Sequence, residues 1–332
     1  MSSRPQILIT APFSAIYVER LKIDFDVVIT AINDSTQPLI EGPHSGLISD
    51  AVVLICELDL VDRATIDKMP KLKLIISCRG TPVNIDIAAC LEKGIKIAHT
   101  PNRNADVTAE ITMCLIVATV RNLFAANEFM NSKKWSKIDP LLAYVSFRGP
   151  SLSGKTLGIV GAGAIGKKVA FFAKSFGCKV IFHDPFVHES EIQDLGSLQT
   201  LEEIFLHSDI VTIHAPLNDK THNLIKKEHF DLLKAGSFFV NVGRAGIVEE
   251  SGFRAAIESG QIARAGLDVY WQEPLPHDHW LFSCPNVLLL PHIGGASDDV
   301  INNHSQIAFE AVNNWRNGLE INQIVSTMEG EQ

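Results

Sequence analysis

The chain has 332 residues, enough for two ordinary domains, and 46% of them are hydrophobic while 20% are charged, which predicts a folded globular protein. The 38 acidic residues outnumber the 29 Lys and Arg residues, and the formal net charge is −9. A broad nucleic-acid-binding or membrane-binding surface is therefore not expected. The six Cys residues lie far apart without a CxxC pair, which indicates reduced thiols in a cytoplasmic protein and gives no sign of a metal site.

No segment predicts a membrane span or a signal peptide. The apolar run over residues 111–120 lies between Glu110 and Arg121 and is too short to cross a bilayer. Near the N-terminus, Pro12 interrupts the apolar stretch and no cleavage pattern follows. We therefore expect a soluble intracellular protein.

Short runs rich in Val and Ile alternate with longer amphipathic stretches, which is the pattern of βαβ units around parallel sheets. In the first hundred residues, helices are predicted at 14–22 and 85–93, the second ended by Gly94. The strands predicted in this region are 7–10, 27–30, 51–55, 72–76 and 95–98.

The alternation begins again at Leu157, where a strand leads into a glycine cluster and then into a helix over 166–176. The last predicted helix covers 298–317 and is ended by Gly318. Its apolar face is expected to contain Val300, Ile301, Ala308, Ala311, Val312 and Trp315. The strands predicted in this half are 157–160, 179–183, 210–214, 238–241, 263–267 and 287–290. Two α/β lobes account for this order of elements.

The glycine cluster at residues 161–166 fits the pattern G-x-G-x-x-G between a predicted strand and a predicted helix. Gly161 would make the tight turn, Gly163 would let the backbone approach a pyrophosphate, and Gly166 would let the helix pack closely on the strand. Asp184, at the end of the next strand, can accept both hydroxyls of an adenosine ribose. The six residues alone could be a simple strand–helix turn, but the whole context predicts a dinucleotide site. No Arg or Lys stands beside Asp184, which favours NAD over NADP.

Three further segments place Arg244, Glu273 and His292 after predicted strands, at the edge where open α/β sheets bind ligands. Hydride transfer to a 2-keto acid needs a clamp for the carboxylate, which an arginine supplies with two donors. It also needs a proton for the carbonyl oxygen, which a histidine can give near neutral pH. A carboxylate bonded to the other ring nitrogen fixes the ring and favours the imidazolium. Each residue taken singly could be an ordinary surface or loop group.

Together these motifs resemble the D-isomer-specific 2-hydroxyacid dehydrogenases. The resemblance covers about residues 72–297 and rests on 161–166 with Asp184, 241–244, 267–274 and 291–295, together with the turn 96–102, Ala109-Glu110 and 214–217. It implies the phosphoglycerate dehydrogenase-like short form, because the residues after His292 leave no room for a regulatory domain.

The resemblance implies a role for each site residue. Arg244 would clamp the substrate carboxylate, His292 would be the acid/base, and Glu273 would be its partner. The implied cofactor is NAD, lined by Gly161, Gly163, Ala164, Ile165, Gly166, Asp184, Ala215, Val242, Gly243, Asp268, Gly295 and Thr81. Within this set Ala164 and Ile165 would touch the pyrophosphate, Asp184 the adenosine ribose and Asp268 the nicotinamide amide. Arg79 and Gly80 would meet the substrate, in a loop that is shorter than the family's usual R-x-G-x-G-[VI]-D-x-[VI]-D and carries Pro82.

The family fold implies a substrate domain of residues 1–103 plus 297–332 and an NAD-binding Rossmann domain of residues 104–296. Each would be a Rossmann-like or flavodoxin-like lobe with a parallel sheet, and the cleft between the lobes would hold the chemistry. Members pair through the NAD-binding domain, so a homodimer is implied, with a small 2-hydroxy or 2-keto acid as the other partner.

Two alternatives stay open. C-terminal-binding corepressors resemble the same family and keep the Arg, Glu and His residues, so an NAD-sensing interaction protein is possible on these residues alone. An alanine dehydrogenase relative lacks the ordered trio and fits less well. A second cation, Arg148, precedes the predicted dinucleotide lobe, where it could be a surface residue or reach the mouth of the cleft.

Overall fold

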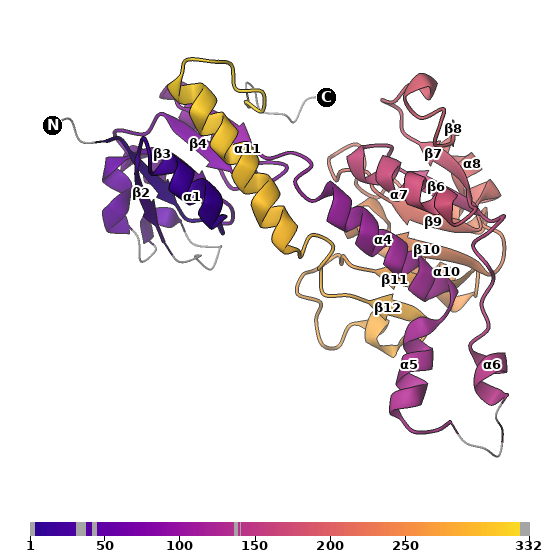
Figure 1. Cartoon of the computed structure of the whole chain (residues 1–332). Coiled ribbons are helices and arrows are strands. Elements are labelled where there is room, and N and C mark those ends of the chain that lie inside the picture. Colours follow the sequence, from indigo (N-terminus) through magenta and orange to yellow (C-terminus); the bar gives the residue numbers. More distant parts are fainter. Residues whose placement is uncertain (1–3, 31–37, 42–44, 136–138, 140, 326–332) are drawn as a thin grey trace. The chain divides into compact units, whose positions relative to one another are not determined.

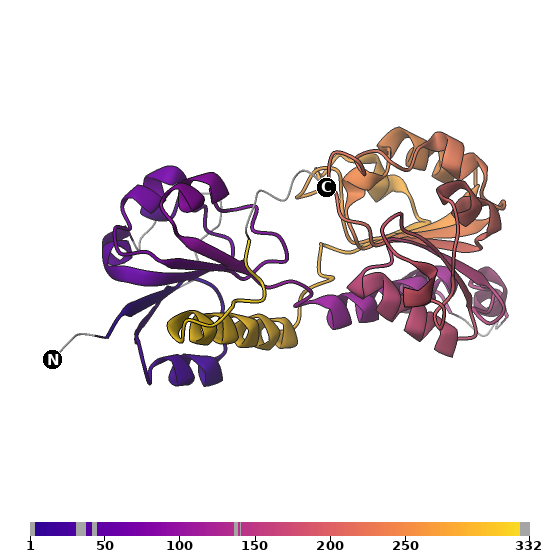
Figure 2. The same ribbon diagram turned by 90° about the horizontal axis from the view of Figure 1, so that it is seen from above.

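The computed structural model describes residues 4–30, 38–41, 45–135, 139 and 141–325. The chain divides into two compact units, one formed by Met1–Asn104 with Ser297–Gln332 and the other by Ala105–Ala296. In each unit, helices cover both faces of a parallel sheet (Figures 1 and 2). The predicted α/β class with two parallel sheets is confirmed.

The first unit contains a five-stranded sheet in the order β2-β1-β3-β4-β5. Its elements are β1 (Gln6–Ile9), α1 (Ala15–Leu21), β2 (Asp26–Ile29), η1 (Leu39–Glu41), η2 (Ser45–Asp50), β3 (Ala51–Cys56), α2 (Arg63–Asp67), β4 (Leu74–Ser77), α3 (Ile87–Glu92), β5 (Lys96–His99) and α11 (Asp298–Arg316). Successive side chains of a strand point to opposite faces, so Ile7 and Ile9 pack with α1 and α11 while Leu8 packs with α2 and α3. The central strand β3 is apolar throughout because both faces of the sheet are covered.

Helix α11 returns to the first unit from the far end of the chain (Figure 1). Ile301 and Trp315 were expected on its inward face but are only partly buried, while His304 and Ser305 are buried there. His304 fits because Nε2 donates to the Pro12 carbonyl at 2.7 Å and Nδ1 accepts from Arg103 at 2.7 Å. Periodicity of apolar residues alone does not show such a hydrogen-bonded polar position.

The second unit contains a seven-stranded sheet in the order β12-β11-β10-β9-β6-β7-β8. Its elements are α4 (Ala105–Val120), α5 (Leu123–Asn131), α6 (Leu142–Ser146), β6 (Thr156–Val160), α7 (Ala164–Ser175), β7 (Lys179–His183), η3 (Glu189–Glu191), β8 (Ser197–Leu198), α8 (Leu201–His207), β9 (Ile210–Ile213), α9 (Lys227–Asp231), β10 (Ser237–Asn241), η4 (Ala245–Ile247), α10 (Glu250–Glu258), β11 (Ile262–Leu267), η5 (Trp280–Ser283) and β12 (Val287–Leu289). The direction of winding changes between β6 and β9, and ligands of doubly wound sheets bind at such a point.

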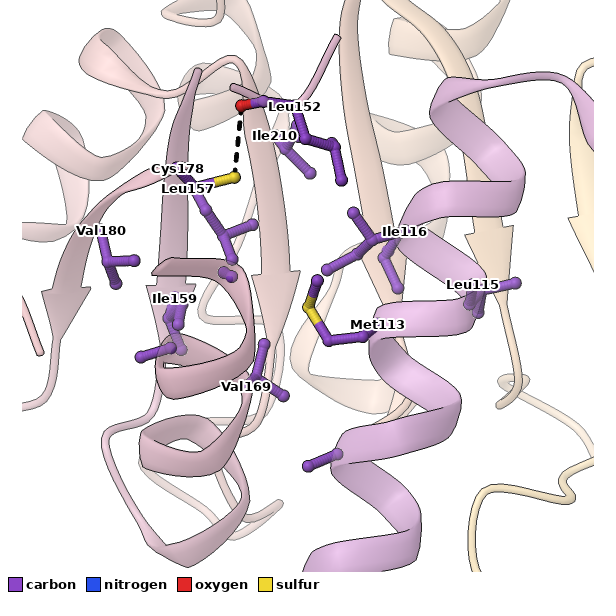
Figure 3. Packing of buried hydrophobic residues seen from close by; sticks show 14 of the residues in the cluster. Met113, Leu115, Ile116, Leu152, Leu157, Ile159, Val169, Cys178, Val180 and Ile210 are labelled. Atoms are coloured by element: carbon purple, nitrogen blue, oxygen red, sulfur yellow. Dashed lines mark hydrogen bonds between the residues drawn. The ribbon is translucent and has the colours of Figure 1, made fainter. Parts of the chain in front are cut away.

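Helices α4 and α7 cover one face of this sheet, and α8, α9 and α10 cover the other. Figure 3 shows Met113 and Ile116 of α4 facing Val169 of α7 and Leu157 of β6. Ten of the sixteen residues of α4 are buried, so the helix is apolar around much of its circumference and lacks the one-sided pattern of a surface helix.

Among the described residues, no single helix is long and apolar enough to cross a membrane. Helices α4 and α5 reach the required length and composition only when joined across a 68° bend. The buried packing of α4 accounts for its apolar composition as a core helix.

Between α4 and β6, the described residues 121–135, 139 and 141–148 form an excursion that we call the α5–α6 arm, and its helices extend away from the sheet of their unit (Figure 1). The large apolar side chains exposed on it are Leu123, Phe124, Met130, Trp135, Leu141, Leu142, Tyr144 and Val145. At its base the Arg264 guanidinium donates to the carbonyl oxygens of Val120 and Arg148 at 3.1 and 3.4 Å. The two ends of the arm are therefore joined through β11.

Candidate active site

Most of the predicted site residues lie at the carboxyl edge of the seven-stranded sheet. Arg244, Glu273 and His292 follow β10, β11 and β12, which are neighbours in the sheet. The glycine loop follows β6 and Asp184 follows β7, on the other side of the winding change. Parallel strands thus bring residues that are far apart in the sequence to one edge of one unit.

His292 and Glu273 form a hydrogen-bonded pair, with Nδ1 2.6 Å from Oε2. A carboxylate accepts, so Nδ1 carries a proton and Nε2 is the ring atom left for a reacting group. The other Glu273 oxygen, Oε1, accepts from the backbone N–H of Tyr270 at 2.9 Å. Both side chains keep substantial exposure, 44% for His292 and 35% for Glu273, so a small molecule can reach the pair.

The backbone at His292 has an unusual conformation, with φ of +55°, a region that residues other than glycine seldom occupy. Its N–H donates to the Leu290 carbonyl at 3.0 Å. The next two N–H groups, of Ile293 and Gly294, donate to the two carboxylate oxygens of Asp268 at 2.8 and 2.7 Å. Asp268 is fully buried, and the contact with a nicotinamide amide expected for it stays a prediction.

Arg244 is exposed at the start of a turn that is fixed by a residue to which the sequence analysis gave no role. The buried Asn241 accepts from the Gly243 N–H at 3.0 Å and donates to the Arg244 carbonyl at 3.2 Å. The guanidinium of Arg244 donates to the carbonyl of Gly243 at 2.8 Å. Asn241 ends β10 and is separated from the predicted clamp only by Val242 and Gly243, and this position was the available signal for its role.

The glycine loop has the local geometry of a phosphate cradle. Gly161 has φ of +101°, and a Cβ there would lie 2.5 Å from the Ala215 nitrogen, so the loops after β6 and β9 touch. A Cβ at Gly166 would lie 2.1 Å from the Gly161 carbonyl oxygen. A Cβ at Gly163 would meet nothing within 4 Å, so this glycine leaves open space at the N-terminus of α7, where N–H groups attract anions.

Asp184 is held against the same loop. Its carboxylate accepts from the N–H of Ala162 at 2.8 Å and from the N–H of Phe186 at 3.0 Å. The open position at Gly163, the start of α7 and this oriented carboxylate fit a dinucleotide whose pyrophosphate lies at the helix and whose ribose lies at Asp184. Ala164 and Ile165 form the first turn of α7, as a contact with the pyrophosphate requires.

His214 is a half-buried polar residue at this edge that the sequence reasoning did not single out as a side chain. Its Nε2 lies 3.1 Å from the Thr212 hydroxyl, while Nδ1 is buried and has no hydrogen-bond partner among the described residues. Burial lowers the pKa of His214 to about 3, because a charged ring would lose its hydration. The ring is therefore neutral beside the loop that contains Ala215.

Arg79, Gly80 and Thr81 belong to the first unit, in the loop after β4. The carbonyl of Gly80 accepts from His99 Nδ1 at 2.6 Å, and the carbonyl of Arg79 accepts from the Thr100 N–H at 3.0 Å. These two hydrogen bonds attach the loop after β4 to the end of β5 and the residue that follows it. This is the carboxyl edge of the five-stranded sheet, where a ligand of that unit would bind.

Arg148 lies at the base of the α5–α6 arm. Its side chain donates to the Val145 carbonyl at 3.4 Å, and its own carbonyl accepts from Arg264, near the first residues of β11. The predicted catalytic residues follow the last residues of their strands. The structure therefore does not bring Arg148 to that edge of its unit.

A doubly wound sheet with a glycine-loop cradle, an acidic residue after the second strand and an Arg/Glu/His edge defines a dinucleotide-dependent oxidoreductase scaffold. The sequence model of the NAD binding domain of D-isomer specific 2-hydroxyacid dehydrogenases matches residues 113–294. The chain belongs to the D-isomer specific 2-hydroxyacid dehydrogenase family and is an NAD-dependent oxidoreductase.

Three similar proteins illustrate the match. YoaD of Bacillus subtilis (strain 168), whose name places it among the 2-hydroxyacid dehydrogenases, is 36% identical over 276 residues, covering 82% of this chain and 79% of its own. A glyoxylate reductase of Thermofilum pendens is 33% identical over 318 residues, covering 92% and 90%. The crystal structure of a glyoxylate reductase from Paecilomyes thermophila is similar with a TM-score of 0.80 and 26% identity, covering 100% of both chains.

Proposed function

We propose that this protein interconverts a D-2-hydroxy acid and its 2-keto acid with NAD, using Arg244 as the carboxylate clamp and His292 with Glu273 as the acid–base pair. The observation that carries the proposal is the 2.6 Å bond between His292 and Glu273, in the loops after β12 and β11, which lie in sheet order beside the strand that ends before Arg244, β10. Arg, Glu and His at one strand edge are the groups that this reaction requires.

When bound, NAD accepts or supplies the hydride at C2 of the acid. In the direction of reduction, His292 donates a proton from Nε2 to the C2 oxygen while Glu273 accepts from Nδ1 and stabilises the positive ring. The Tyr270 N–H holds Glu273 in the position for this bond. Arg244 offers its planar pair of donors to the substrate carboxylate and so orients the ketone. In the direction of oxidation, the neutral His292 takes the hydroxyl proton.

For NAD itself, we assign the cradle to the residues predicted at the carboxyl edge of the second unit. Gly163 and the first turn of α7 would face the pyrophosphate, Asp184 would accept from the ribose hydroxyls, and Ala215 would line the cofactor from the loop after β9. The open space at Gly163 and the orientation of Asp184 support this assignment. Residues 104–296 would form the NAD-binding domain, and residues 1–103 with 297–332 the substrate domain, to which Arg79, Gly80 and Thr81 belong.

The substrate class is a small 2-hydroxy acid. Relatives with 30–36% identity are named glyoxylate reductase, D-3-phosphoglycerate dehydrogenase and 2-hydroxyacid dehydrogenase. Glyoxylate, hydroxypyruvate and phosphohydroxypyruvate therefore head the candidates. Because these relatives are named as dehydrogenases and reductases, an enzyme that turns over a 2-keto acid is favoured over an NAD-sensing protein of the corepressor type.

The test is a panel of 2-keto acids assayed with NADH, followed by oxidation of the D and L enantiomers of the best chiral product, since the glycolate formed from glyoxylate is achiral. We expect turnover of at least one acid and oxidation of the D enantiomer only. His292→Ala is the control, because it should lose turnover and keep NADH binding. NADH binding by the wild type without turnover of any acid would instead favour the interaction protein.

A homodimer through the second unit is also proposed, because the α5–α6 arm exposes eight large apolar side chains, more than monomers usually leave on one extension. Light scattering should give twice the mass of the chain. Phe124→Asp with Leu142→Asp should give the monomer, whereas Phe282→Asp, at an exposed phenylalanine outside the arm, should not. A monomeric wild type would contradict the proposal.

A cytoplasmic location is proposed from the thiols. All six cysteines are free, and Cys56, Cys78, Cys90 and Cys178 are buried, which fits a reducing compartment. Fractionation of the native cells should place the protein with the cytoplasmic enzymes.

A further inference from the structure

Four hydrogen bonds link the loops after β11 and β12, and a fifth, within the loop after β11, completes a closed circuit around the acid–base pair. His292 Nδ1 donates to Glu273, whose other oxygen accepts from the Tyr270 N–H. Two residues before Tyr270, the carboxylate of Asp268 accepts from the N–H groups of Ile293 and Gly294. The Tyr270 hydroxyl donates to the Leu290 carbonyl at 2.7 Å, so the same segment holds the turn of His292 from both sides.

The turn needs such support because its central residue is under local strain. The positive φ of His292 brings its Cβ close to the backbone, and a histidine does not adopt this conformation without compensation from its surroundings. Asp268 supplies this compensation, because its two oxygens accept from the next two N–H groups while the side chain is fully buried. A carboxylate suits this position because both of its oxygens accept.

We propose that Asp268 is a positioning residue of the acid–base pair, which holds the left-handed turn at His292 and thereby keeps His292 within hydrogen-bond distance of Glu273. Tyr270 holds the opposite end of the same turn through Leu290. This inference rests on the proposed role of His292 and goes beyond it. It also differs from the expected contact of Asp268 with the nicotinamide amide, which would act on NAD and not on the turn.

The first variant is Asp268→Asn, which keeps the shape of the side chain but turns an NH₂ group toward one of the two N–H donors. The turn then loses one acceptor and gains a repulsive contact. We expect kcat for ketone reduction to fall about 10- to 100-fold with KM changed less than about threefold, since a displaced catalytic group costs turnover more than binding. The upper pH limit of reduction should move to lower pH, because a looser contact with Glu273 favours the protonated ring less.

Among the described residues that follow the strands at this edge, Glu273, Tyr270, Asp268 and Arg244 also carry ionisable groups. Burial raises the pKa of Tyr270 to about 12, so this phenol stays neutral in the assay range. A direct readout is therefore needed beside activity. The Nδ1–H proton between His292 and Glu273 should give a far-downfield ¹H NMR resonance, assigned by its loss in His292→Gln, and this resonance should weaken or disappear in Asp268→Asn.

A second variant leaves the carboxylate in place. An alanine Cβ at Gly294 would lie 2.9 Å from Asp268 Oδ2 and 2.9 Å from Val242, so Gly294→Ala should push the carboxylate off the turn. We expect the same loss of kcat and of the downfield resonance. Tyr270→Phe, which removes the hydroxyl bonds to the carbonyls of Leu290 and Leu267 but keeps the Tyr270 N–H bond to Glu273, should show a smaller loss in the same direction.

The matched control is Asp209→Asn. Asp209 also accepts from a backbone N–H, that of Thr156 at 2.8 Å, but at the amino edge of the same sheet. Asp209→Asn should lower the free energy of unfolding without changing kcat, the upper pH limit of ketone reduction or the downfield resonance of the His292 Nδ1–H proton. The proposal is overturned if Asp268→Asn keeps wild-type kcat, or if it loses NADH affinity while the resonance persists and Gly294→Ala stays active. If the wild type reduces no 2-keto acid, the resonance still tests the positioning role independently of the proposed activity.

Discussion

Nδ1 of His292 lies 2.6 Å from Oε2 of Glu273, although the two residues are in loops after different strands. Strands β11 and β12 are parallel neighbours, with Leu267 opposite Leu289, so the loops that follow them leave the sheet side by side. The bond is therefore a consequence of strand order combined with two short loops of fixed shape. This relationship makes the pair testable by small changes at either side chain.

Removal of the ring should stop the chemistry and spare the cofactor site. If His292 is the proton donor, His292→Ala should lower kcat by roughly 10²–10⁴-fold while NADH binding, followed by fluorescence, is retained.

Glu273→Gln should narrow the pH range of ketone reduction from the alkaline side, because the amide no longer favours the imidazolium. Arg244→Lys should raise KM and lower kcat, since a point charge cannot replace the planar fork. Near wild-type turnover in His292→Ala would reject the assignment of the site.

Replacing glycine by alanine should have different effects at two positions of the glycine loop, on NADH binding at one and on stability at the other. Gly163→Ala should leave the free energy of unfolding nearly unchanged, since its Cβ points to open space, but should weaken NADH binding because that space is the proposed phosphate position. Gly166→Ala should destabilise the unit by about 1–3 kcal/mol, since its Cβ would lie 2.1 Å from the Gly161 carbonyl oxygen. Urea unfolding and NADH titration of both variants make the check. Equal effects on binding and on stability in the two variants would contradict the division of roles.

The strands and their carboxyl edges could be predicted from the sequence because buried parallel strands are short runs of Val and Ile. The predicted strand over 179–183 coincides with β7, and the other predicted strands differ from the observed ones by one or two residues at their ends. Helix α4 was not predicted, because a helix buried around most of its surface shows no polar stripe. The short helices of the α5–α6 arm have no buried residues and so show no core-facing pattern.

The candidate site was predictable to the level of which residues follow which strand. The contacts that orient those residues were not, because they depend on backbone groups that every sequence contains. The bonds of Asp268 to the N–H groups of Ile293 and Gly294 are the main example. The hydrogen bonds of buried His304 to Pro12 and Arg103 connect segments that are distant in sequence, which apolar periodicity does not report.

Asp184 should make the enzyme prefer NADH over NADPH. A 2′-phosphate about 4 Å from this carboxylate would cost on the order of 2–4 kcal/mol at an effective dielectric near 20, which is roughly a 30- to 1,000-fold preference in kcat/KM. The bonds from Ala162 and Phe186 fix the carboxylate in place, so it cannot easily turn away. Asp184→Ala should reduce the preference and also weaken NADH binding. Comparable kcat/KM values of the wild type with the two cofactors would refute this prediction.

Acid should destabilise the second unit through His214. Its pKa is about 3 in the folded protein because of burial, and about 6.5 when the chain is unfolded. The unfolded state therefore binds more protons between these values, so the stabilising contribution is complete above pH 6.5 and is lost as the pH falls toward 3, by up to about 1.4 kcal/mol per pH unit.

His214→Gln should flatten the slope of unfolding free energy against pH between 6.5 and 4.5, measured by urea unfolding. Burial also lowers the pKa of His304 in the first unit, so part of the slope should remain. His222→Gln, at an exposed ring, is the control and should keep the full slope. An unchanged slope in His214→Gln would show that His214 does not titrate as the buried geometry requires.

The final prediction concerns the choice of substrate through Arg79. This half-buried arginine lies in the loop after β4, whose backbone is anchored by the Thr100 N–H at the Arg79 carbonyl. If its guanidinium meets the substrate, acids with a second anionic or strongly polar group should gain a charge-assisted hydrogen bond. Such a bond of about 1.5–3 kcal/mol separates these acids from pyruvate by roughly 10- to 100-fold in kcat/KM.

Arg79→Ala should therefore lose activity mainly on a phosphorylated or dicarboxylic 2-keto acid and much less on pyruvate or glyoxylate. The matched control is Arg63→Ala, because Arg63 is an exposed cation of the same unit that pairs with Glu92 through two bonds of 2.7 and 3.0 Å. It should leave the ratio of the two activities unchanged. Equal losses on both kinds of acid in Arg79→Ala, or no loss on either, would show that Arg79 does not select for a second charge. A selective loss would identify the loop after β4 as the part of the chain that sets which 2-hydroxy acid is used.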